Sequence, residues 1–164
     1  MNFQIHFDIE RLPMLVHRFP LSLATLIALA GAAHADPITL TDQGGRTVTL
    51  EKPAERIASI PIPMASTIIA MDGGTSKLVG MNPTAKSAIV EGVLGRIFPE
   101  AKDIPSDITA PNFIPNVEEL AATNPELVIQ WADYGADLVD PITNAGLNVA
   151  LISYGTEEKA RYYQ

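Results

Sequence analysis

The sequence contains no cysteine, and its three histidines, His6, His17 and His34, all lie near the amino terminus. The absence of cysteine excludes disulfide bonds and thiolate ligands for a metal ion. Residues 36–164 also lack imidazole, the side chain that most often transfers protons or binds metals near neutral pH. The familiar nucleophile–base pairs and zinc sites are therefore excluded there. This argues against an enzyme, and no pattern predicts a cofactor.

A glycine-rich phosphate loop is also missing, because Gly44-Gly45 and Gly73-Gly74 lack the strand–loop–helix context that such a loop needs. Basic residues are few, with 11 Lys and Arg against 19 Asp and Glu, and the net charge is −8. A nucleic-acid partner needs a basic surface, and anionic lipid repels an acidic protein. The charge therefore argues against nucleic acid and against adhesion to anionic membranes.

Long hydrophobic runs are absent as well. The most apolar segment, Leu21–Ala30, has about half of the roughly twenty residues that a membrane-spanning helix needs. It follows two arginines and precedes Ala33-His34-Ala35, which has the small–x–small pattern of a cleavage site. We predict that residues 1–35 are a signal peptide cleaved after Ala35 and that the mature protein is periplasmic. An uncleaved membrane anchor is the alternative that the short run disfavours.

The predicted signal peptide has two possible starts. Asp8 and Glu10 are acidic, which is unusual before the apolar core of such a segment. Translation from Met14 would omit both, so Met14 is an alternative to Met1. In either case, removing residues 1–35 from the 164-residue sequence leaves 129 residues, the size of one domain.

The mature chain alternates between short strands and helices. The predicted strands are 38–41, 47–50, 56–60, 78–81, 127–129 and 148–153, and the predicted helices are 65–71, 87–98, 117–123 and 141–145. The first two strands flank the turn residues Asp42–Arg46 and form a β-hairpin. The remaining alternation indicates an α/β fold with a Rossmann-like, doubly wound, mainly parallel sheet. We expect the apolar face of the helix at 87–98 to lie in the core.

The segments that follow the parallel strands are predicted to form a binding site, because the carboxyl ends of such strands meet at one edge of a sheet. These segments are aromatic, apolar and lightly polar, which suits a bulky, partly aromatic ligand better than a small ion. The predicted ligand-binding residues are Pro63, Met64, Asn82, Thr84, Trp131, Tyr134 and Tyr154. A packing role for Trp131 and a simple surface role for the two tyrosines stay open.

One helix–strand unit is especially well marked. Asn116 can cap a helix, with Glu119 reaching back toward it, and Asn124-Pro125 ends that helix. Leu127-Val128-Ile129 is then a wholly apolar run, typical of a strand covered on both faces. Glu118 and Glu119 are adjacent and do not share a helix face, so their local interpretation is favourable charge at a helix start.

Several segments occur in the order and spacing of a known family. They are Asp42-Gln-Gly-Gly-Arg-Thr-Val, Pro53-Ala-Glu-Arg-Ile, Leu78-Val-Gly, Asn116-Val-Glu-Glu-Leu and Asn124-Pro-Glu-Leu-Val-Ile. Together they make the chain, over about Ile38–Ser153, similar to the periplasmic substrate-binding proteins of iron-siderophore, haem and vitamin B12 ABC importers. Glu126 stands where aspartate is usual in that family.

The resemblance implies two α/β lobes joined by a long rigid helix, with the ligand held between them. Residues 36–155 would form the N-terminal lobe, and residues 156–164 would begin the interlobe helix, so the chain looks truncated. Glu118, with Glu119 beside it, matches the glutamate that meets an arginine of the membrane permease. Trp131 matches an aromatic position that lines the ligand cleft in some members.

The function that the resemblance implies is binding, without chemistry, of a ferric-siderophore-type iron complex and its delivery to an ABC permease. Haem and vitamin B12 are alternative ligands, because each fits an aromatic cleft. A hypothesis of a different class is a non-functional truncated fragment, since one lobe without the second lobe exposes apolar surface. Pro141 departs from the family's continuous helix and is expected to shorten or kink it.

Overall fold

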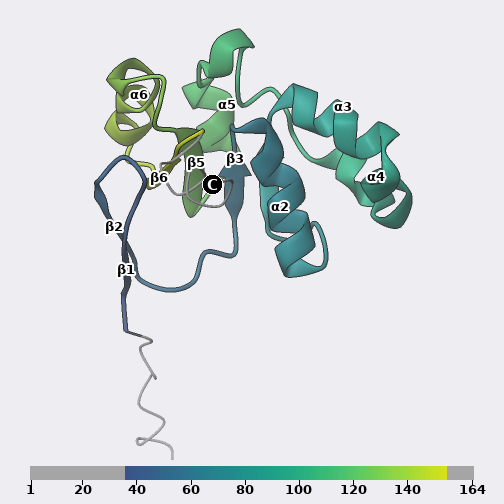
Figure 1. The fold of residues 1–164 in the computed structure, drawn as a ribbon, viewed down its shortest axis with the longest axis horizontal. Coiled ribbons are helices and arrows are strands. Elements are labelled where there is room, and N and C mark those ends of the chain that lie inside the picture. Colours follow the sequence, from purple (N-terminus) through teal and green to yellow (C-terminus); the bar gives the residue numbers. More distant parts are fainter. Residues whose placement is uncertain (1–35, 155–164) are drawn as a thin grey trace, which may run out of the picture. The chain divides into compact units, whose positions relative to one another are not determined.

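The computed structural model describes residues 36–154, which alternate between strands and helices (Figure 1). The strands are β1 (Ile38–Thr41), β2 (Thr47–Leu50), β3 (Ile57–Ser59), β4 (Leu78–Met81), β5 (Leu127–Trp131) and β6 (Val149–Ile152). The helices are α2 (Ile62–Asp72), α3 (Pro83–Glu91), α4 (Val93–Ile97), α5 (Val117–Ala122) and α6 (Asp140–Asn144), with 3₁₀ turns η1 (Pro99–Asp103), η2 (Pro111–Phe113) and η3 (Ala136–Leu138). The predicted signal peptide and the predicted start of an interlobe helix lie outside the described residues.

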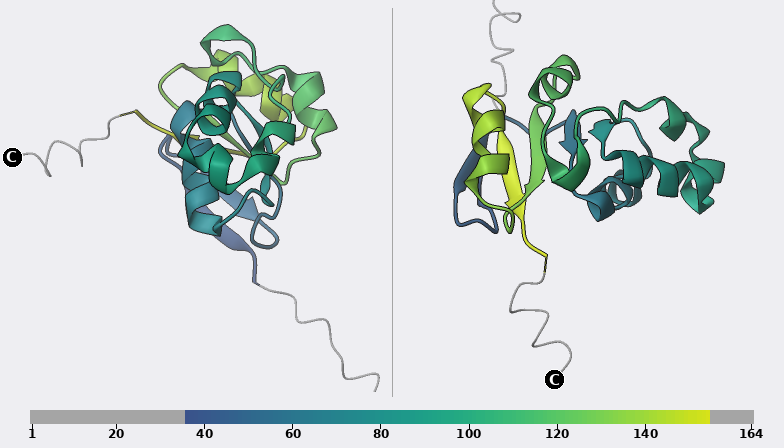
Figure 2. Two further views of the ribbon diagram at one scale, coloured as in Figure 1. Left: turned by 90° about the vertical axis from the view of Figure 1, so that its right-hand side faces the viewer. Right: turned by 90° about the horizontal axis from the view of Figure 1, so that it is seen from above.

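The central sheet has four strands in the order β4-β3-β5-β6, and all of its pairings are parallel. The antiparallel pair β1-β2 forms a separate hairpin. Figure 2 shows α2, α3 and α4 gathered toward the β4 end of the sheet and α6 with the hairpin toward the β6 end. The predicted α/β class, with a mainly parallel sheet preceded by a hairpin, is confirmed.

Two hydrophobic clusters cover the two faces of the sheet. One contains Ile69 of α2, Met81 of β4 and other buried residues of α2, β4 and α3. The other contains Leu120 of α5 and other buried residues of β3, β5, α6 and β6. Consecutive residues of β5 divide between them, since Ile129 belongs to the first and Val128 to the second. This alternation is what a strand buried on both faces produces, and it confirms the doubly wound arrangement.

The tip of the hairpin fastens onto the outer edge of β6. The Asp42 carboxylate accepts a hydrogen bond from the Leu151 N–H, and the Gln43 N–H donates to the Leu151 carbonyl at 3.0 Å. Arg46 donates to the Val149 carbonyl at 2.8 Å and forms an ion pair with Asp42. The backbone groups along an edge strand are thereby occupied by a segment that precedes β6 by about a hundred residues.

Helix α2 begins earlier than predicted. The helix predicted at 65–71 implied a stiff loop over Pro61–Met64, but Pro61 is the N-cap and the helix starts at Ile62. Proline fits the first helical turn, because its missing N–H would have no helical partner there. The loop prediction was therefore wrong, and Pro63 and Met64 lie in the first turn of a helix.

The single helix predicted at 87–98 is two helices that meet at Gly92. The first of them, α3, starts before the predicted residue 87: its N-cap is Asn82, whose side chain accepts from the Thr84 N–H at 2.8 Å. A Cβ on Gly95 would lie 2.3 Å from the Val90 carbonyl oxygen, so only glycine allows this corner. The chain therefore folds back at a position where the apolar periodicity predicted continuity.

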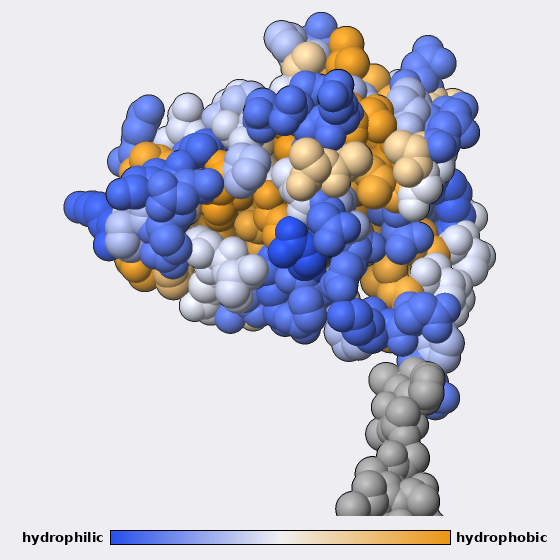
Figure 3. All heavy atoms as spheres, turned by 180° about the vertical axis from the view of Figure 1, so that it is seen from behind, coloured by the Kyte–Doolittle hydropathy of each residue, from blue (hydrophilic) through white to orange (hydrophobic). Residues whose placement is uncertain are grey.

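The corner leaves part of the predicted core face in solvent. Val90, Val93 and Ile97 are 39%, 57% and 60% exposed, whereas Ile89 of the same face is buried. The region of α3 and α4 shows hydrophobic residues at its surface (Figure 3, left side). The prediction that this face lies in the core was thus right for Ile89 and wrong for the other three. None of the helices within residues 36–154 has the length and apolar character that crossing a membrane requires.

Candidate functional site

The carboxyl ends of the four parallel strands lie along one edge of the sheet. After β4, the Asn82 N–H donates to the Ser59 carbonyl of β3 at 3.0 Å. After β5, the Ala132 N–H donates to the Ile152 carbonyl of β6 at 2.8 Å. The segments expected to form the site therefore begin next to one another, as the parallel topology requires.

Four aromatic residues form what we call the aromatic cluster, at the β5 and β6 ends of this edge: Phe113, Trp131, Tyr134 and Tyr154. The Trp131 ring meets Phe113 at 6.1 Å and Tyr154 at 5.6 Å between centroids, both edge to face. Tyr134 packs on Phe113 at 5.2 Å. Trp131 is only 5% exposed, whereas Tyr134 and Tyr154 are 53% and 76% exposed. The cluster thus has a buried centre and two exposed rings.

A buried glutamine holds the cluster together. The Gln130 side chain is fully buried and donates through Nε2 to the Phe113 carbonyl at 3.1 Å. Its oxygen accepts from the backbone N–H of Trp131 at 2.8 Å. It therefore ties the segment that carries Phe113 to the end of β5. Neither Gln130 nor Phe113 was among the predicted site residues. A lone amide within the apolar run of β5 is the sequence signal that could have identified Gln130.

The segment that carries Phe113 has an unusual backbone. Asn112 and Phe113 have φ values of 61° and 62°, in the left-handed region that residues other than glycine rarely adopt. Such conformations cost on the order of 1–3 kcal/mol each and persist where the surroundings impose them. The Thr109–Pro115 bridge and the Ala110 N–H bond to the Ile114 carbonyl close the segment on either side. Phe113 is thereby fixed against Trp131 despite the strain.

The other four predicted ligand residues lie at the β3 and β4 ends of the edge. The Asn82 side chain is buried and its oxygen caps α3, which gives it a structural function. Thr84 and Pro63 are exposed on the first turns of α3 and α2, and Met64 packs against the first core cluster. Pro63 also lines an apolar pocket of about 300 Å³ between α2, α3 and α4. The structure therefore brings Trp131, Tyr134 and Tyr154 into the aromatic cluster at the β5 and β6 ends, while these four lie on the segments that follow β3 and β4.

An aspartate joins the two loops that carry the exposed tyrosines. Asp133 accepts from the Tyr154 N–H at 2.6 Å and from the Ser153 hydroxyl at 2.7 Å. These hydrogen bonds, that from Tyr154 first, hold the pKa of the Asp133 carboxyl below its ordinary value. The loop after β5 is thus linked to the loop after β6 by a charged acceptor. Within the described residues, no group of three or more acidic or histidine side chains could hold a metal ion.

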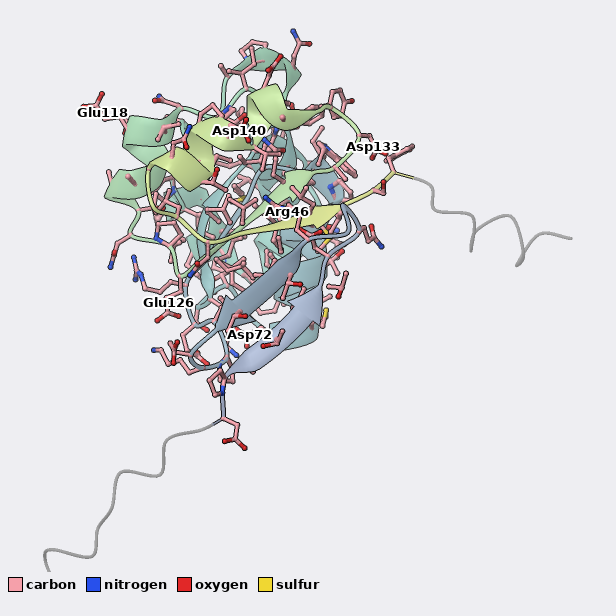
Figure 4. All side chains as sticks on the ribbon, turned by 90° about the vertical axis from the view of Figure 1, so that its left-hand side faces the viewer. Arg46, Asp72, Glu118, Glu126, Asp133 and Asp140 are labelled. Carbon is pink, nitrogen blue, oxygen red and sulfur yellow. The ribbon has the colours of Figure 1, made fainter. Side chains whose placement is uncertain are left out.

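Glu118 and Glu119 lie on the first turn of α5 and are exposed, and Glu118 points away from the fold (Figure 4). Asn116 is the N-cap, as predicted, but its side chain makes no capping hydrogen bond. The expected side-chain cap and its reciprocal contact from Glu119 are therefore absent from the described structure. Both carboxylates remain available to a partner.

No family model and no curated protein matches the sequence. Among solved structures, the chain is similar to a periplasmic solute-binding protein from Veillonella parvula DSM 2008, at 33% identity and a TM-score of 0.69 over 75% of this chain and 37% of that one. It is also similar to the TroA-like periplasmic binding protein FepB from Veillonella parvula (28% identity, TM-score 0.53, 74% and 38% coverage). A third is the heme binding protein HmuT (25% identity, TM-score 0.52, 74% and 36% coverage). The chain thus spans between a third and two fifths of the length of these proteins.

Proposed function

We propose that this chain, which has the fold of one lobe of the periplasmic solute-binding proteins, is the solute-binding component of an ABC importer, or the N-terminal lobe of that component. Its solute is a ferric-siderophore-type iron complex, which it delivers to the membrane permease. The aromatic cluster carries this proposal. Two exposed tyrosines on a buried aromatic base, held at the edge where open α/β sheets bind ligands, offer a broad surface to a bulky ligand.

The proposed location is periplasmic, with export through a signal peptide that is removed after Ala35. The similar proteins are periplasmic by their names, and the apolar segment before Ala35 has the length of a signal-peptide core. Mass spectrometry of the exported protein tests this part of the proposal. A mature N-terminus far from Asp36 would contradict it.

Titration with ferric siderophores tests the ligand. Trp131 is the sole tryptophan of the sequence, so its fluorescence reports on the aromatic cluster without interference. We expect saturable quenching by a ferric hydroxamate or catecholate, with the metal-free chelator as the control. Saturable binding of a ferric complex would support the proposal, and the absence of any effect would contradict it.

Haem is the second candidate, because one of the similar proteins is a heme binding protein. Vitamin B12 is the third, on the size of the aromatic surface alone. Exclusive binding of haemin or cobalamin in the same titration would replace the iron complex by that ligand while retaining the binding function.

The competing hypothesis is a fragment that binds nothing. Exposed apolar residues such as Val93 and Ile97 favour aggregation of a chain that lacks a partner surface. Size-exclusion chromatography and denaturant unfolding separate the two hypotheses. A monodisperse, cooperatively unfolding chain is expected from a functional lobe, whereas aggregation without a folding transition is expected from the fragment.

A further inference from the structure

One buried side-chain atom among the described residues has no hydrogen-bond partner, and it is Nε1 of Trp131. An indole nitrogen can only donate a hydrogen bond. Buried polar groups are nearly always paired, because an unpaired one has lost its hydration without replacement. This donor therefore requires an explanation, and its only possible partner is an acceptor atom.

Specific contacts fix the residues that surround the Trp131 indole. Gln130 uses both ends of its amide to fix the Trp131 backbone and the Phe113 carbonyl, and the strained backbone at Asn112 and Phe113 keeps the Phe113 ring on the indole. Left-handed non-glycine residues occur preferentially at binding sites, where surrounding contacts maintain the strain. The same contacts that bury the indole also hold its N–H in one place.

Tyr154 is the exposed ring that packs directly on the indole, and it is therefore placed to cover this donor. Its ring packs edge to face on Trp131, yet 76% of the residue is exposed and it lies in the loop after β6. Phe113 on the other side of the indole is anchored through its carbonyl by Gln130. Asp133 holds the Tyr154 backbone, so we expect only the exposed Tyr154 side chain to turn aside when a solute reaches the indole.

We propose that Trp131 Nε1 donates a hydrogen bond to an acceptor oxygen of the bound solute, and that Tyr154 covers this donor until the solute is bound. This inference rests on the proposed function and specifies its ligand chemistry. The solute carries a carbonyl, hydroxamate or carboxylate oxygen beside a bulky surface that packs on the aromatic rings. A bare cation, or a ligand that offers only donors, does not satisfy the site.

The single tryptophan makes the inference directly measurable. A ¹⁵N-labelled sample of the full chain has one tryptophan indole N–H resonance, which moves downfield when the N–H gains an acceptor. Two diamagnetic probes are used: the gallium complex of desferrioxamine B, with hydroxamate oxygens, and gallium protoporphyrin IX, with carboxylates. A saturable downfield shift with one probe supports the inference and shows which kind of oxygen is the acceptor.

The remaining outcomes separate the inference from the function on which it rests. If backbone resonances near Trp131 shift on titration but the indole resonance does not move downfield, the hydrogen bond is wrong and the binding function stands. If no resonance shifts with any probe, including cobalamin, both are contradicted. Trp131→Phe, which retains a ring but loses the N–H, is expected to weaken probe affinity roughly three- to tenfold.

Two tyrosine variants test the cover without any ligand. Tyr154→Ala is expected to red-shift Trp131 fluorescence and to accelerate exchange of the indole proton, because the indole gains contact with water. Tyr134→Ala is the matched control, since the exposed Tyr134 ring packs on Phe113, with 5.2 Å between ring centroids, and not on Trp131. Equal effects of the two variants, or no effect of Tyr154→Ala, would overturn the proposed cover.

Discussion

The Asp42 carboxylate accepts a hydrogen bond from the Leu151 N–H at 3.1 Å, across 109 positions of sequence. The same carboxylate accepts from the backbone N–H of Gly44 and of Arg46 and pairs with the Arg46 guanidinium. One nearly buried charge thus closes the hairpin turn and attaches it to the last strand of the sheet. We expect this contact to contribute strongly to stability, because it satisfies several donors at once.

Replacing this carboxylate gives the first prediction. Asp42→Ala leaves the Leu151 N–H without its acceptor, and we expect the free energy of unfolding to fall by about 2–3 kcal/mol. Asp107→Ala, at an exposed loop carboxylate, is the matched control and should change stability by less than about 0.5 kcal/mol. Urea unfolding followed by circular dichroism measures both. Equal stability of the two variants would show that the hairpin tip contributes nothing to the fold.

The acid dependence of stability gives the second prediction. Burial raises the pKa of Asp42, but hydrogen bonds from Arg46 and Leu151 outweigh it, so the folded-state pKa lies below the ordinary value of 3.8. Asp42 therefore stabilises the fold fully above about pH 4, and this contribution disappears as the pH falls through the lower folded-state pKa. Unfolding midpoints measured between pH 6 and pH 2 should decline more steeply for the wild-type chain than for Asp42→Ala.

The corner between α3 and α4 gives the third prediction. Helix propensity alone favours alanine over glycine at Gly95 by about 1 kcal/mol. The structure predicts the opposite sign, because a Cβ there would lie 2.3 Å from the Val90 carbonyl oxygen, and overpacking costs about 1–3 kcal/mol. Gly74→Ala, where a Cβ meets nothing within 4 Å, is the control. A stabilised Gly95→Ala variant would mean that α3 and α4 form one continuous helix.

Gln130 gives the fourth prediction. Gln130→Leu keeps the side-chain volume but removes both the donor to the Phe113 carbonyl and the acceptor for the backbone N–H of Trp131. We expect a loss of about 1–3 kcal/mol in the free energy of unfolding and a red shift of Trp131 fluorescence, because Phe113 is released. Tryptophan emission spectra of the folded variant measure the second effect. Unchanged emission would show that Phe113 keeps its place without Gln130.

The exposed carboxylates of α5 give the fifth prediction. If the two carboxylates dock to the permease as the resemblance implies, Glu118→Ala combined with Glu119→Ala should impair solute uptake. Solute affinity should stay unchanged, because both side chains are exposed on the first turn of α5 and neither belongs to the aromatic cluster. Uptake in cells and solution titration measure the two properties separately. A fall in affinity together with uptake would contradict this division of functions.

Features specified by neighbouring residues were predicted accurately. The bounds of β1, β2 and β4 agree with the sequence interpretation. Alternating or β-branched residues beside turn residues define β1 and β2 locally, and a short apolar run followed by Asn82-Pro83 defines β4. The start of α2 was predicted three residues too late, because Pro61 and Pro63 indicated a loop although proline also suits the first turn of a helix. The periodicity at 87–98 continued through Gly92 and Gly95, and only the steric environment of Gly95 reveals the corner.

Features that depend on distant contacts were not predicted. Trp131 and the two tyrosines were expected at the site, but the depth of Trp131 depends on Phe113, which arrives from a separate segment. The left-handed backbone at Phe113 occurs where the Gln130 side chain bonds its carbonyl, and no local sequence pattern indicates it. The attachment of Asp42 to β6 likewise involves residues too far apart for any local pattern to relate them.

The attachment of the hairpin tip also limits how a larger protein can be built from this unit. Exposed edge strands readily pair with a further strand from the same or another chain, but the outer edge of β6 is already bonded at Val149, Leu151 and Ser153 by Asp42, Gln43 and Arg46. The sheet therefore cannot grow past β6. A companion lobe that met the protein at this edge would therefore share loops and side chains with it rather than a continuous ladder of backbone hydrogen bonds.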